Sequence, residues 1–376
     1  MTLVTILIYL LILAVLVIVH ELGHFLVAKL FRVRVEEFGI GFPPRLVKLG
    51  RWLETDFVLN LIPLGGYVNL SGENAPAQPG TETTDGEFYT KPAWQRFLVI
   101  LAGPLVNLVL AAIVFMIAYS VYGIPREVPG MVFIDYLEPG SPADRLQLPV
   151  GARIVSVADA SSSLQVQQME DVAGFTRERL GSEISITLDD SCSNSVCSDN
   201  LATYEARLRG AEEIPAGGGA LGIAMTNYQD FHYPWYQQLP YSVYYGGRQS
   251  LRLSWQMLQG LGVALRQLFS REPKQAVLMG PVGIVGELAR AKTFQQGLME
   301  IVSFAGFLSL NLGIINLLPI PAVDGGRLFL IICEKAFGRA RIAKVEGMLN
   351  YIGFIGIMIL AALITIADVM RLTKGG

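Results

Sequence analysis

The sequence His20-Glu21-Leu22-Gly23-His24 lies inside a long apolar run that extends over residues 3–30. Residues four apart stack on one face of a helix, about 6 Å from each other, so the two imidazoles can hold one metal ion. Zinc suits this pattern, and the glutamate between the histidines is placed to take a proton from a water molecule. The chain has only 3 histidines, and two of them belong to this motif. The motif therefore predicts a metal site with His20 and His24 as ligands.

The position of the motif favours a metal site over two histidines and a glutamate that merely pack inside a helix. A charged side chain near the centre of a bilayer costs at least ~2.5–3.5 kcal/mol. Packing alone leaves that cost unexplained, whereas metal binding and proton transfer require these side chains.

The composition is that of a membrane protein. Hydrophobic residues make up 52% of the chain and charged residues 16%, below the ~25% charged residues of soluble domains. Four segments reach the ~17–25 apolar residues that a membrane-spanning helix needs: residues 3–30, 97–121, 298–318 and 349–369. The first is not expected to be a cleaved signal peptide, because it lacks a basic n-region and a cleavage site and is too long. The net charge of −3, without a basic stripe that carries aromatic residues, excludes nucleic acid as a partner.

Lysines and arginines near the spans predict the orientation of the chain. They cluster between the first and second spans, at Arg32, Arg34, Arg45, Lys48, Arg51, Lys91 and Arg96, and between the third and fourth, at Arg327, Lys335, Arg339, Arg341 and Lys344. Both connecting segments are therefore predicted to be cytoplasmic. This places the termini and the long central segment, residues 122–296, outside, although Arg371 and Lys374 near the C-terminus run against it.

A zinc protease site needs a third protein ligand and an open position for water. The other polar cluster at membrane depth is Asn316-Leu-Leu-Pro-Ile-Pro-Ala-Val-Asp324-Gly-Gly, at the end of the third span. Its prolines cannot continue a helix, and irregular backbone at this depth survives only inside protein or beside a wet cavity. Asp324, followed by two glycines, is free to turn its carboxylate toward a metal; taken alone, it favours an ordinary turn. Paired with His20 and His24 on the same predicted side, it is expected to be the third ligand.

The two motifs together resemble the signatures of the site-2 protease family, which are intramembrane zinc metalloproteases. Further similarity to that family runs through most of the chain, at residues 62–73, 91–97, 102–107 and 280–284. With the long outer segment, the chain is most similar to the bacterial regulator-of-sigma-E protease type.

The resemblance implies that His20, His24 and Asp324 bind Zn²⁺ and that Glu21 is the general base. It also implies substrate contacts for Asn316 and Asn311, with a helix-end cap as the alternative for Asn316. The chemistry is self-consistent, because zinc lowers the pKa of its bound water toward ~7 and polarises the scissile carbonyl. Glu21 can then pass the proton to the leaving amine, and an asparagine amide can hold the substrate backbone or the oxyanion.

Residues 57–62 and 67–70 have the pattern of two short strands around a turn at residues 63–66. A transmembrane substrate must unwind before its peptide bonds are accessible, and the edge of such a hairpin could accept it as a further strand. The resemblance implies that this hairpin dips into the membrane; a soluble cytoplasmic hairpin is the alternative.

Residues 130–227 change in character, with short β-type runs, small loops and no stretch long enough to span a membrane. Residues 132–137, 138–144 and 151–157 look like the first strand, the turn and helix, and the next strand of a PDZ domain. Residues 219–225 would be its carboxylate-binding loop and strand, displaced to the end as in permuted bacterial PDZ domains. We therefore expect an extracytoplasmic α+β domain in which Leu221, Gly222 and Ile223 bind a peptide C-terminus. The family type usually carries two such domains and one is found here, which leaves open whether it gates or recruits substrates.

The remaining parts of the chain complete the predicted organisation. Residues 1–121 and 298–376 form the two membrane halves, and residues 228–297 form an outer amphipathic region whose helix, over residues 251–269, lies on the membrane surface. Cys192 and Cys197 lie in one acidic, serine-rich loop, where an oxidising compartment would favour a small disulfide ring over two thiols. Cys333, predicted to be cytoplasmic, should be a free thiol.

The leading functional hypothesis is an intramembrane zinc endopeptidase. It would cleave single-span membrane proteins whose outer parts have already been trimmed, and so release a regulator such as an anti-sigma factor or remove signal-peptide remnants. The expected location is the bacterial cytoplasmic membrane, in contact with lipid. A transmembrane metal-ion transporter is the alternative, but a transporter does not need Glu21 and the chain shows no inverted repeats. A catalytically inactive tether is disfavoured because no element of the zinc site is missing.

Overall fold

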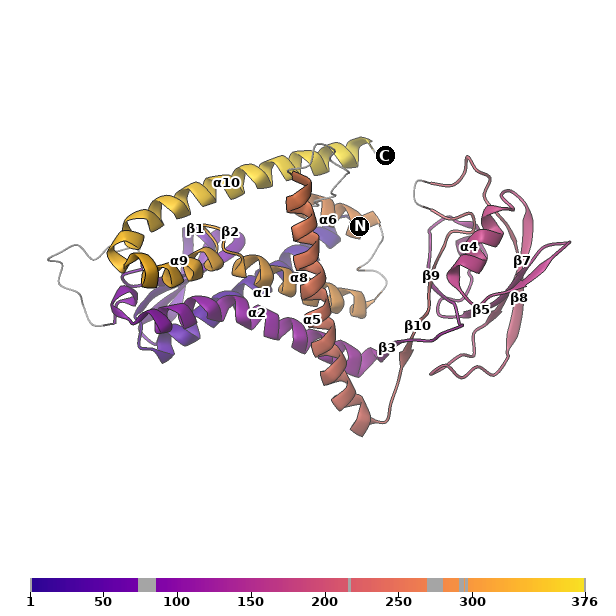
Figure 1. Cartoon of the computed structure of the whole chain (residues 1–376), viewed down its shortest axis with the longest axis horizontal. Helices are drawn as coiled ribbons and strands as arrows, with labels where there is room; N and C mark the ends of the chain where they lie inside the picture. The colour runs from indigo at the N-terminus through magenta and orange to yellow at the C-terminus, as the bar shows by residue number, and fades with distance from the viewer. Residues whose placement is uncertain are drawn as a thin grey trace. The chain divides into compact units, whose positions relative to one another are not determined.

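The computed structural model describes residues 2–73, 86–215, 218–268, 280–290, 294 and 297–374. The chain divides into two compact units. One consists of Met1–Ala118 and Val243–Gly376 and is called the membrane unit below; the other, Tyr119–Ser242, is called the inserted unit. Figure 1 traces the chain through both.

Four helices in the described residues are long and apolar enough to cross a membrane, which confirms the four predicted spans. They are α1 (Thr2–Leu30), α2 (Ala93–Tyr122), α8 (Leu298–Leu317) and α10 (Arg339–Lys374). Only 6–39% of the most apolar window of each helix is buried. The outward-facing apolar surface is what a lipid solvent permits, since lipid tails are as apolar as these side chains.

The amphipathic helix predicted over residues 251–269 begins earlier in the chain. It is α5 (Trp235–Leu268), and residue 269 lies outside the described residues. Leu253 and Met257 pack against a cluster of α2 and α8 side chains, Ala111, Phe115 and Leu310. A Cβ at Gly246 would lie 2.7 Å from the Met116 backbone nitrogen, so only glycine permits this approach. One face of α5 therefore packs on two spans, while Trp255 remains 62% exposed.

The predicted hairpin is present, but its turn lies elsewhere. Strands β1 (Val35–Trp52) and β2 (Thr55–Leu70) are joined at Leu53 and Glu54, whose φ values are 47° and 61°. Residues 37–40 of β1 lie between two parts of β2, residues 56–59 and residues 66–69. The predicted turn at residues 63–66 was therefore wrong, because both predicted strands pair with β1 and not with each other. Two-residue turns with positive φ usually carry Asn or Gly, a signal that Leu53-Glu54 lacks.

The inserted unit is built on an antiparallel sheet with the strand order β8-β7-β5-β4-β9, in which β6 also pairs with β5. Its elements are β4 (Phe133–Leu137), α3 (Pro142–Arg145), β5 (Arg153–Ala158), β6 (Ser163–Gln165), α4 (Met169–Arg177), β7 (Glu183–Asp189), β8 (Leu201–Arg207) and β9 (Ile223–Thr226). The core includes Ile134, Ile154 and Ile186, each at most 1% exposed. The first and last strands of the unit, β3 (Ile124–Glu127) and β10 (Tyr228–Phe231), pair separately as a two-stranded ribbon.

A disulfide closes a small loop of this unit. It joins Cys192 to Cys197 with an S–S distance of 2.02 Å. Gln229 of β10 donates from Nε2 to the Cys192 carbonyl oxygen at 2.8 Å and accepts from the Ser195 backbone N–H at 2.7 Å. The closed loop is thus fixed to the ribbon by hydrogen bonds. Cys333 is a free thiol.

Candidate metal centre

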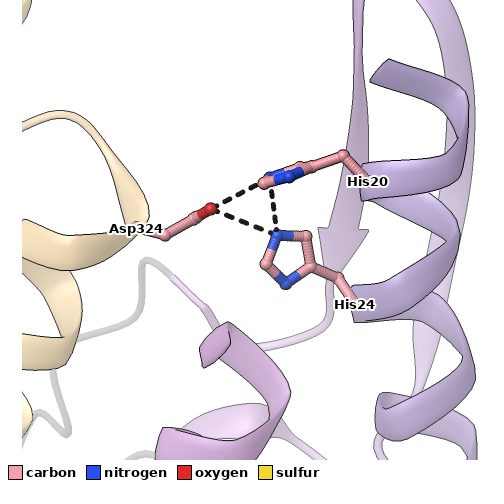
Figure 2. Close-up of side chains that lie close together, drawn as sticks. All are labelled: His20, His24 and Asp324. Carbon is pink, nitrogen blue, oxygen red and sulfur yellow. Dashed lines mark hydrogen bonds and ion pairs between the residues drawn. The ribbon is translucent and has the colours of Figure 1, made fainter. Parts of the chain in front are cut away.

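Three side chains from distant parts of the membrane unit meet at one point, as Figure 2 shows. His20 and His24 come from successive turns of α1, and Asp324 is the first residue of α9 (Asp324–Phe337). The two histidine Nε2 atoms lie 3.2 Å apart. Asp324 Oδ2 lies 3.0 Å from His20 Nε2 and 3.4 Å from His24 Nε2. The residues predicted to be ligands therefore converge, and both histidines are buried.

This donor set suits zinc. Two imidazole nitrogens and one carboxylate oxygen are typical ligands of a catalytic zinc site, which keeps a further position for water. In a tetrahedral site with bonds of about 2.0–2.1 Å, neighbouring ligand atoms lie about 3.3 Å apart. The three separations of 3.0–3.4 Å are close to this spacing. An ion of this size fits with little movement of the side chains.

The backbone of α2 orients His24. The Nδ1 atom of His24 lies 2.8 Å from the carbonyl oxygen of Val99. Because a carbonyl oxygen only accepts, Nδ1 must carry the proton and donate it. The lone pair on Nε2 is then directed at the cluster, as in metal-binding histidines whose other ring nitrogen donates to a backbone carbonyl oxygen.

Two glycines allow α1 and α2 to approach each other beside the cluster. A Cβ at Gly23 would lie 2.7 Å from the Ala102 carbonyl oxygen, and one at Gly103 would lie 2.2 Å from His24 Nε2. Any side chain at residue 103 would therefore occupy the space where the histidine nitrogens converge.

The start of α9 positions Asp324. The irregular segment after α8 includes Pro319, Pro321 and Ala322, which has a φ of 76°. Cβ atoms at Gly325 and Gly326 would lie 2.1 and 2.3 Å from the carbonyl oxygens of Leu318 and Ile320. The two glycines thus lie in the first turn of a helix packed against the preceding loop, so this segment is not the ordinary turn that Asp324-Gly-Gly favours when taken alone.

A buried ion pair ties α9 to α2. Arg96 donates from Nη1 and Nη2 to both carboxylate oxygens of Glu334, at 2.9 and 2.5 Å, and both side chains are at most 10% exposed. Bidentate pairs of this kind fix orientation as well as distance. The pair therefore helps to hold the helix that carries Asp324 beside the helix that packs on His24.

A cavity opens beside the cluster. Glu21, His24 and Asp324 line one part of it, and residues 66–70 of β2 line another. Arg327 and Glu73, which form an ion pair with each other, complete the lining with Ile100. Glu21 thus shares a cavity with two of the candidate ligands, His24 and Asp324, and with one side of the β1–β2 sheet. In the described part of the chain, residues 66–70 pair only with β1.

The two asparagines predicted to contact substrate do not line this cavity. Asn316 is half-buried in the last turn of α8. Asn311 donates from Nδ2 to the Phe307 carbonyl oxygen one turn earlier, at 3.1 Å.

The predicted peptide-binding residues lie together in the inserted unit. Leu221, Gly222 and Ile223 line a cavity with α4, which contributes Val172 and Thr176. Ala143 donates its backbone N–H to the Leu221 carbonyl oxygen at 3.1 Å, and Glu138 donates to that of Gly222 at 2.9 Å. The turn before α3 and α3 itself therefore fix the loop that precedes β9.

Sequence reasoning missed the residues that support the cluster from α2. Arg96, Gly103 and Asn107 were assigned no role at the metal centre, although residues 102–107 form one of the motifs that resemble the family. The pattern Gly-Pro-Leu-Val-Asn inside an apolar span was the available signal, because Gly and Asn are costly in a lipid-exposed helix.

Comparison with known proteins identifies similarity to metalloproteases over nearly the whole chain. A family model described as peptidase family M50 matches residues 8–360. The zinc metalloprotease RasP of Geobacillus kaustophilus is 27% identical over an alignment 451 positions long, gaps included, which covers 98% of this chain and 99% of the relative. RasP of Bacillus licheniformis is 26% identical over an alignment of 445 positions, which covers 98% of this chain and 99% of the relative. A protein of Rickettsia conorii is 30% identical over 366, covering 96% of each chain.

Proposed function

The chain belongs to peptidase family M50 and is a zinc metalloprotease of the site-2 protease type, and from this premise we propose that it cleaves the transmembrane segments of single-span membrane proteins. The observation that carries the proposal is the cavity that Glu21, His24 and Asp324 share with residues 66–70 of β2. It brings a candidate hydrolytic centre and a strand edge together within a unit that has four membrane-capable helices.

The strand edge explains how a helical substrate could be cut. A transmembrane helix satisfies all its backbone groups internally, so its peptide bonds become accessible only after local unwinding. Residues 66–70 can offer backbone hydrogen bonds to an unwound stretch, which would add to the sheet as a strand. We propose that this side of the sheet presents the scissile bond to Glu21.

His20, His24 and Asp324 would hold Zn²⁺. When bound, the ion would serve as a Lewis acid that lowers the pKa of water and polarises a carbonyl oxygen. The Glu21 carboxylate would take a proton from the attacking water and deliver it to the nitrogen of the leaving amine. Asn316 and Asn311 are proposed to contact the substrate backbone on the family resemblance alone.

The inserted unit is proposed to be an extracytoplasmic PDZ-like domain. Support comes from β4, α3, β5 and β9, which occupy the segments expected of its first strand, helix, second strand and last strand. The cavity beside Leu221, Gly222 and Ile223 would accept a peptide C-terminus, such as the stub left by a first protease.

We favour a gating role for this domain, because steric exclusion of a folded ectodomain is stronger than the modest binding of one PDZ domain. Deleting the domain should allow cleavage of untrimmed substrates if it gates, and should slow cleavage of trimmed ones if it recruits. Unchanged selectivity in a folded deletion variant would contradict both roles.

The location proposed is the bacterial cytoplasmic membrane, with the segments around Arg45 and Lys335 on the cytoplasmic side. Single cysteines at these two positions should be shielded from a membrane-impermeant thiol reagent in intact cells, whereas one at Asp189 should react. The opposite labelling pattern would reverse the orientation.

The transporter alternative is not supported, because the relatives are named as zinc metalloproteases.

The direct test uses detergent-purified protein with a model single-span substrate. Glu21→Gln should keep zinc and the fold but abolish cleavage, since an amide cannot act as a base. A zinc chelator should abolish cleavage by the wild type, and added zinc should restore it. Cleavage by Glu21→Gln at a rate near that of the wild type would overturn the proposed mechanism.

A further inference from the structure

Asn107 lies in α2 and is fully buried, at 0% exposure. Its side-chain Nδ2 atom faces His20 Nδ1 at 3.2 Å. The Oδ1 atom of the same amide is buried without a hydrogen-bond partner among the described residues. The backbone at this position is held separately, because Ser309 of α8 donates from Oγ to the Asn107 carbonyl oxygen at 2.8 Å. A polar side chain at membrane depth is thus aimed at a candidate metal ligand with half of its hydrogen-bonding capacity unused.

The position of the proton on the His20 ring decides which end of the Asn107 amide, Oδ1 or Nδ2, should face that ring. Nε2 of His20 points into the cluster, 3.0 Å from Asp324 Oδ2. A neutral histidine that gives its Nε2 lone pair to a metal carries its proton on Nδ1. That Nδ1–H needs an acceptor, which an amide NH₂ group cannot provide. A half-turn of the Asn107 amide exchanges its oxygen and nitrogen with almost no change in shape.

His24 provides the internal comparison. Its Nδ1 faces the carbonyl oxygen of Val99, a group that can only accept. The backbone therefore fixes the tautomer of His24 that carries its proton on Nδ1 and leaves Nε2 free to bind a metal. His20 has a side-chain amide in the equivalent place, which can present either an acceptor or a donor.

We propose that Asn107 is a positioning residue that accepts a hydrogen bond from His20 Nδ1–H through Oδ1 and thereby directs the His20 Nε2 lone pair to zinc. The inference rests on the proposed ligand set. It adds the residue that selects the tautomer of His20 in which Nδ1 carries the proton. Asn107 touches neither the substrate nor the reacting atoms, so its effect appears in metal affinity and ligand geometry.

The experiment compares Asn107→Leu, which keeps the branching and the number of side-chain heavy atoms but removes the acceptor, with Asn107→Asp, which keeps an acceptor. Ser309→Ala is the matched control, because it alters the backbone contact of Asn107 and leaves its amide in place. Zinc dissociation constants are measured on detergent-purified full chain by competition with a chelator, and the Co²⁺-substituted protein is examined by visible absorption. Circular dichroism of each variant checks the fold.

We expect Asn107→Leu to weaken zinc binding about 10–100-fold, the usual effect of removing such an outer partner, and to change the cobalt spectrum. Asn107→Asp and Ser309→Ala should stay within a few-fold of the wild type. Unchanged affinity in a folded Asn107→Leu, or equal weakening in the Leu and Asp variants, would overturn the proposal. If Asn107→Leu does not fold, Asn107→Asp decides: retained affinity and spectrum support the acceptor role, and weakening contradicts it.

A parallel measurement on His20→Ala separates this inference from the proposed function. If His20→Ala keeps zinc, the ligand set itself is wrong. If His20→Ala loses zinc while Asn107→Leu does not, only the role of Asn107 fails.

Discussion

An isoleucine of α10 and an isoleucine of β5 have opposite surroundings. Ile359 is 57% exposed although it lies in a membrane-capable helix, whereas Ile154 is completely buried in the sheet of the inserted unit. The membrane unit can turn apolar side chains outward because lipid is as apolar as they are. The inserted unit buries them, as expected where water is the solvent. The same residue type therefore contributes very differently to stability in the two units.

Buried polar groups differ between the units in a complementary way. In the inserted unit, Thr176 donates its hydroxyl to the Val172 carbonyl oxygen one turn earlier, and the hydroxyl of Ser141 caps α3. In the membrane unit, His20 and His24 bond to groups of other helices. In these examples, the buried hydroxyls of the inserted unit bond only to backbone groups, whereas the buried imidazoles of the membrane unit bring together three elements, α1, α2 and α9, at a candidate reactive site.

The largest expected effect tests the contrast between the buried polar groups of the two units. His24→Ala should strongly reduce zinc occupancy and lower cleavage of a model substrate on the order of 10³-fold or more, as when one member of a catalytic group is removed. The matched change is His232→Ala, since His232 is an exposed residue of the inserted unit. It should leave both zinc content and cleavage unchanged. Equal zinc loss in the two variants would remove the distinction.

A matched pair of isoleucine substitutions tests the contrast between the exposed Ile359 and the buried Ile154. Ile154→Ala should destabilise the inserted unit by about 2–5 kcal/mol, because it leaves a cavity in a closed core. Ile359→Ala should change stability by less than about 1 kcal/mol, since the side chain is largely exposed. Urea titration of the full chain in detergent, followed by proteolysis, gives both values. Similar losses would show that α10 is covered by protein.

The disulfide provides a smaller effect confined to the inserted unit. The cysteines are separated by 5 residues, and closing so short a loop is worth roughly 2 kcal/mol by chain entropy. Replacing both Cys192 and Cys197 by serine should lower the urea midpoint of this unit accordingly. Cys333→Ser should have no effect there. A reducing agent should reproduce the double variant, and a midpoint insensitive to both would show that the loop adds no stability.

The smallest effect concerns Asp159, at the turn between β5 and β6. Arg179 donates from Nε to its carboxylate at 2.5 Å, and this bond, with that from Ser161, holds the pKa of Asp159 well below its usual range. The pKa is lower in the folded state, so the contribution to stability is full above the unfolded pKa of ~3.9 and is lost as the pH falls through the folded pKa. Asp159→Asn should therefore slightly lower the urea midpoint at pH 7 and flatten its decline below pH 4. An unchanged acid decline would show that other carboxylates cause it.

The sequence could predict what depends on local composition. The four spans and the His-Glu-x-x-His helix follow from apolar runs and fixed helical spacing. The proximity of Asp324 to the histidines was also predictable, because polar residues at membrane depth need a shared environment.

Features that depend on backbone packing could not be predicted in the same way. The turn at Leu53-Glu54 uses positive φ values without Gly or Asn. The sequence Asp-Gly-Gly at the start of α9 is typical of a turn. The need for glycine at residues 325 and 326 becomes clear only from the carbonyl groups packed against them. The role of Asn107 depends on a contact between residues separated by 87 positions.

The β3–β10 ribbon has a consequence for evolution and engineering. Its register pairs Ile124 with Phe231, so the chain enters and leaves the inserted unit through neighbouring residues. Segments with adjacent ends can be gained, lost or exchanged without pulling apart the elements that flank them. A cut at these two points defines a cassette: a related domain could be transplanted there, or the ribbon closed by a short linker, while the residues of the metal centre keep their own scaffold.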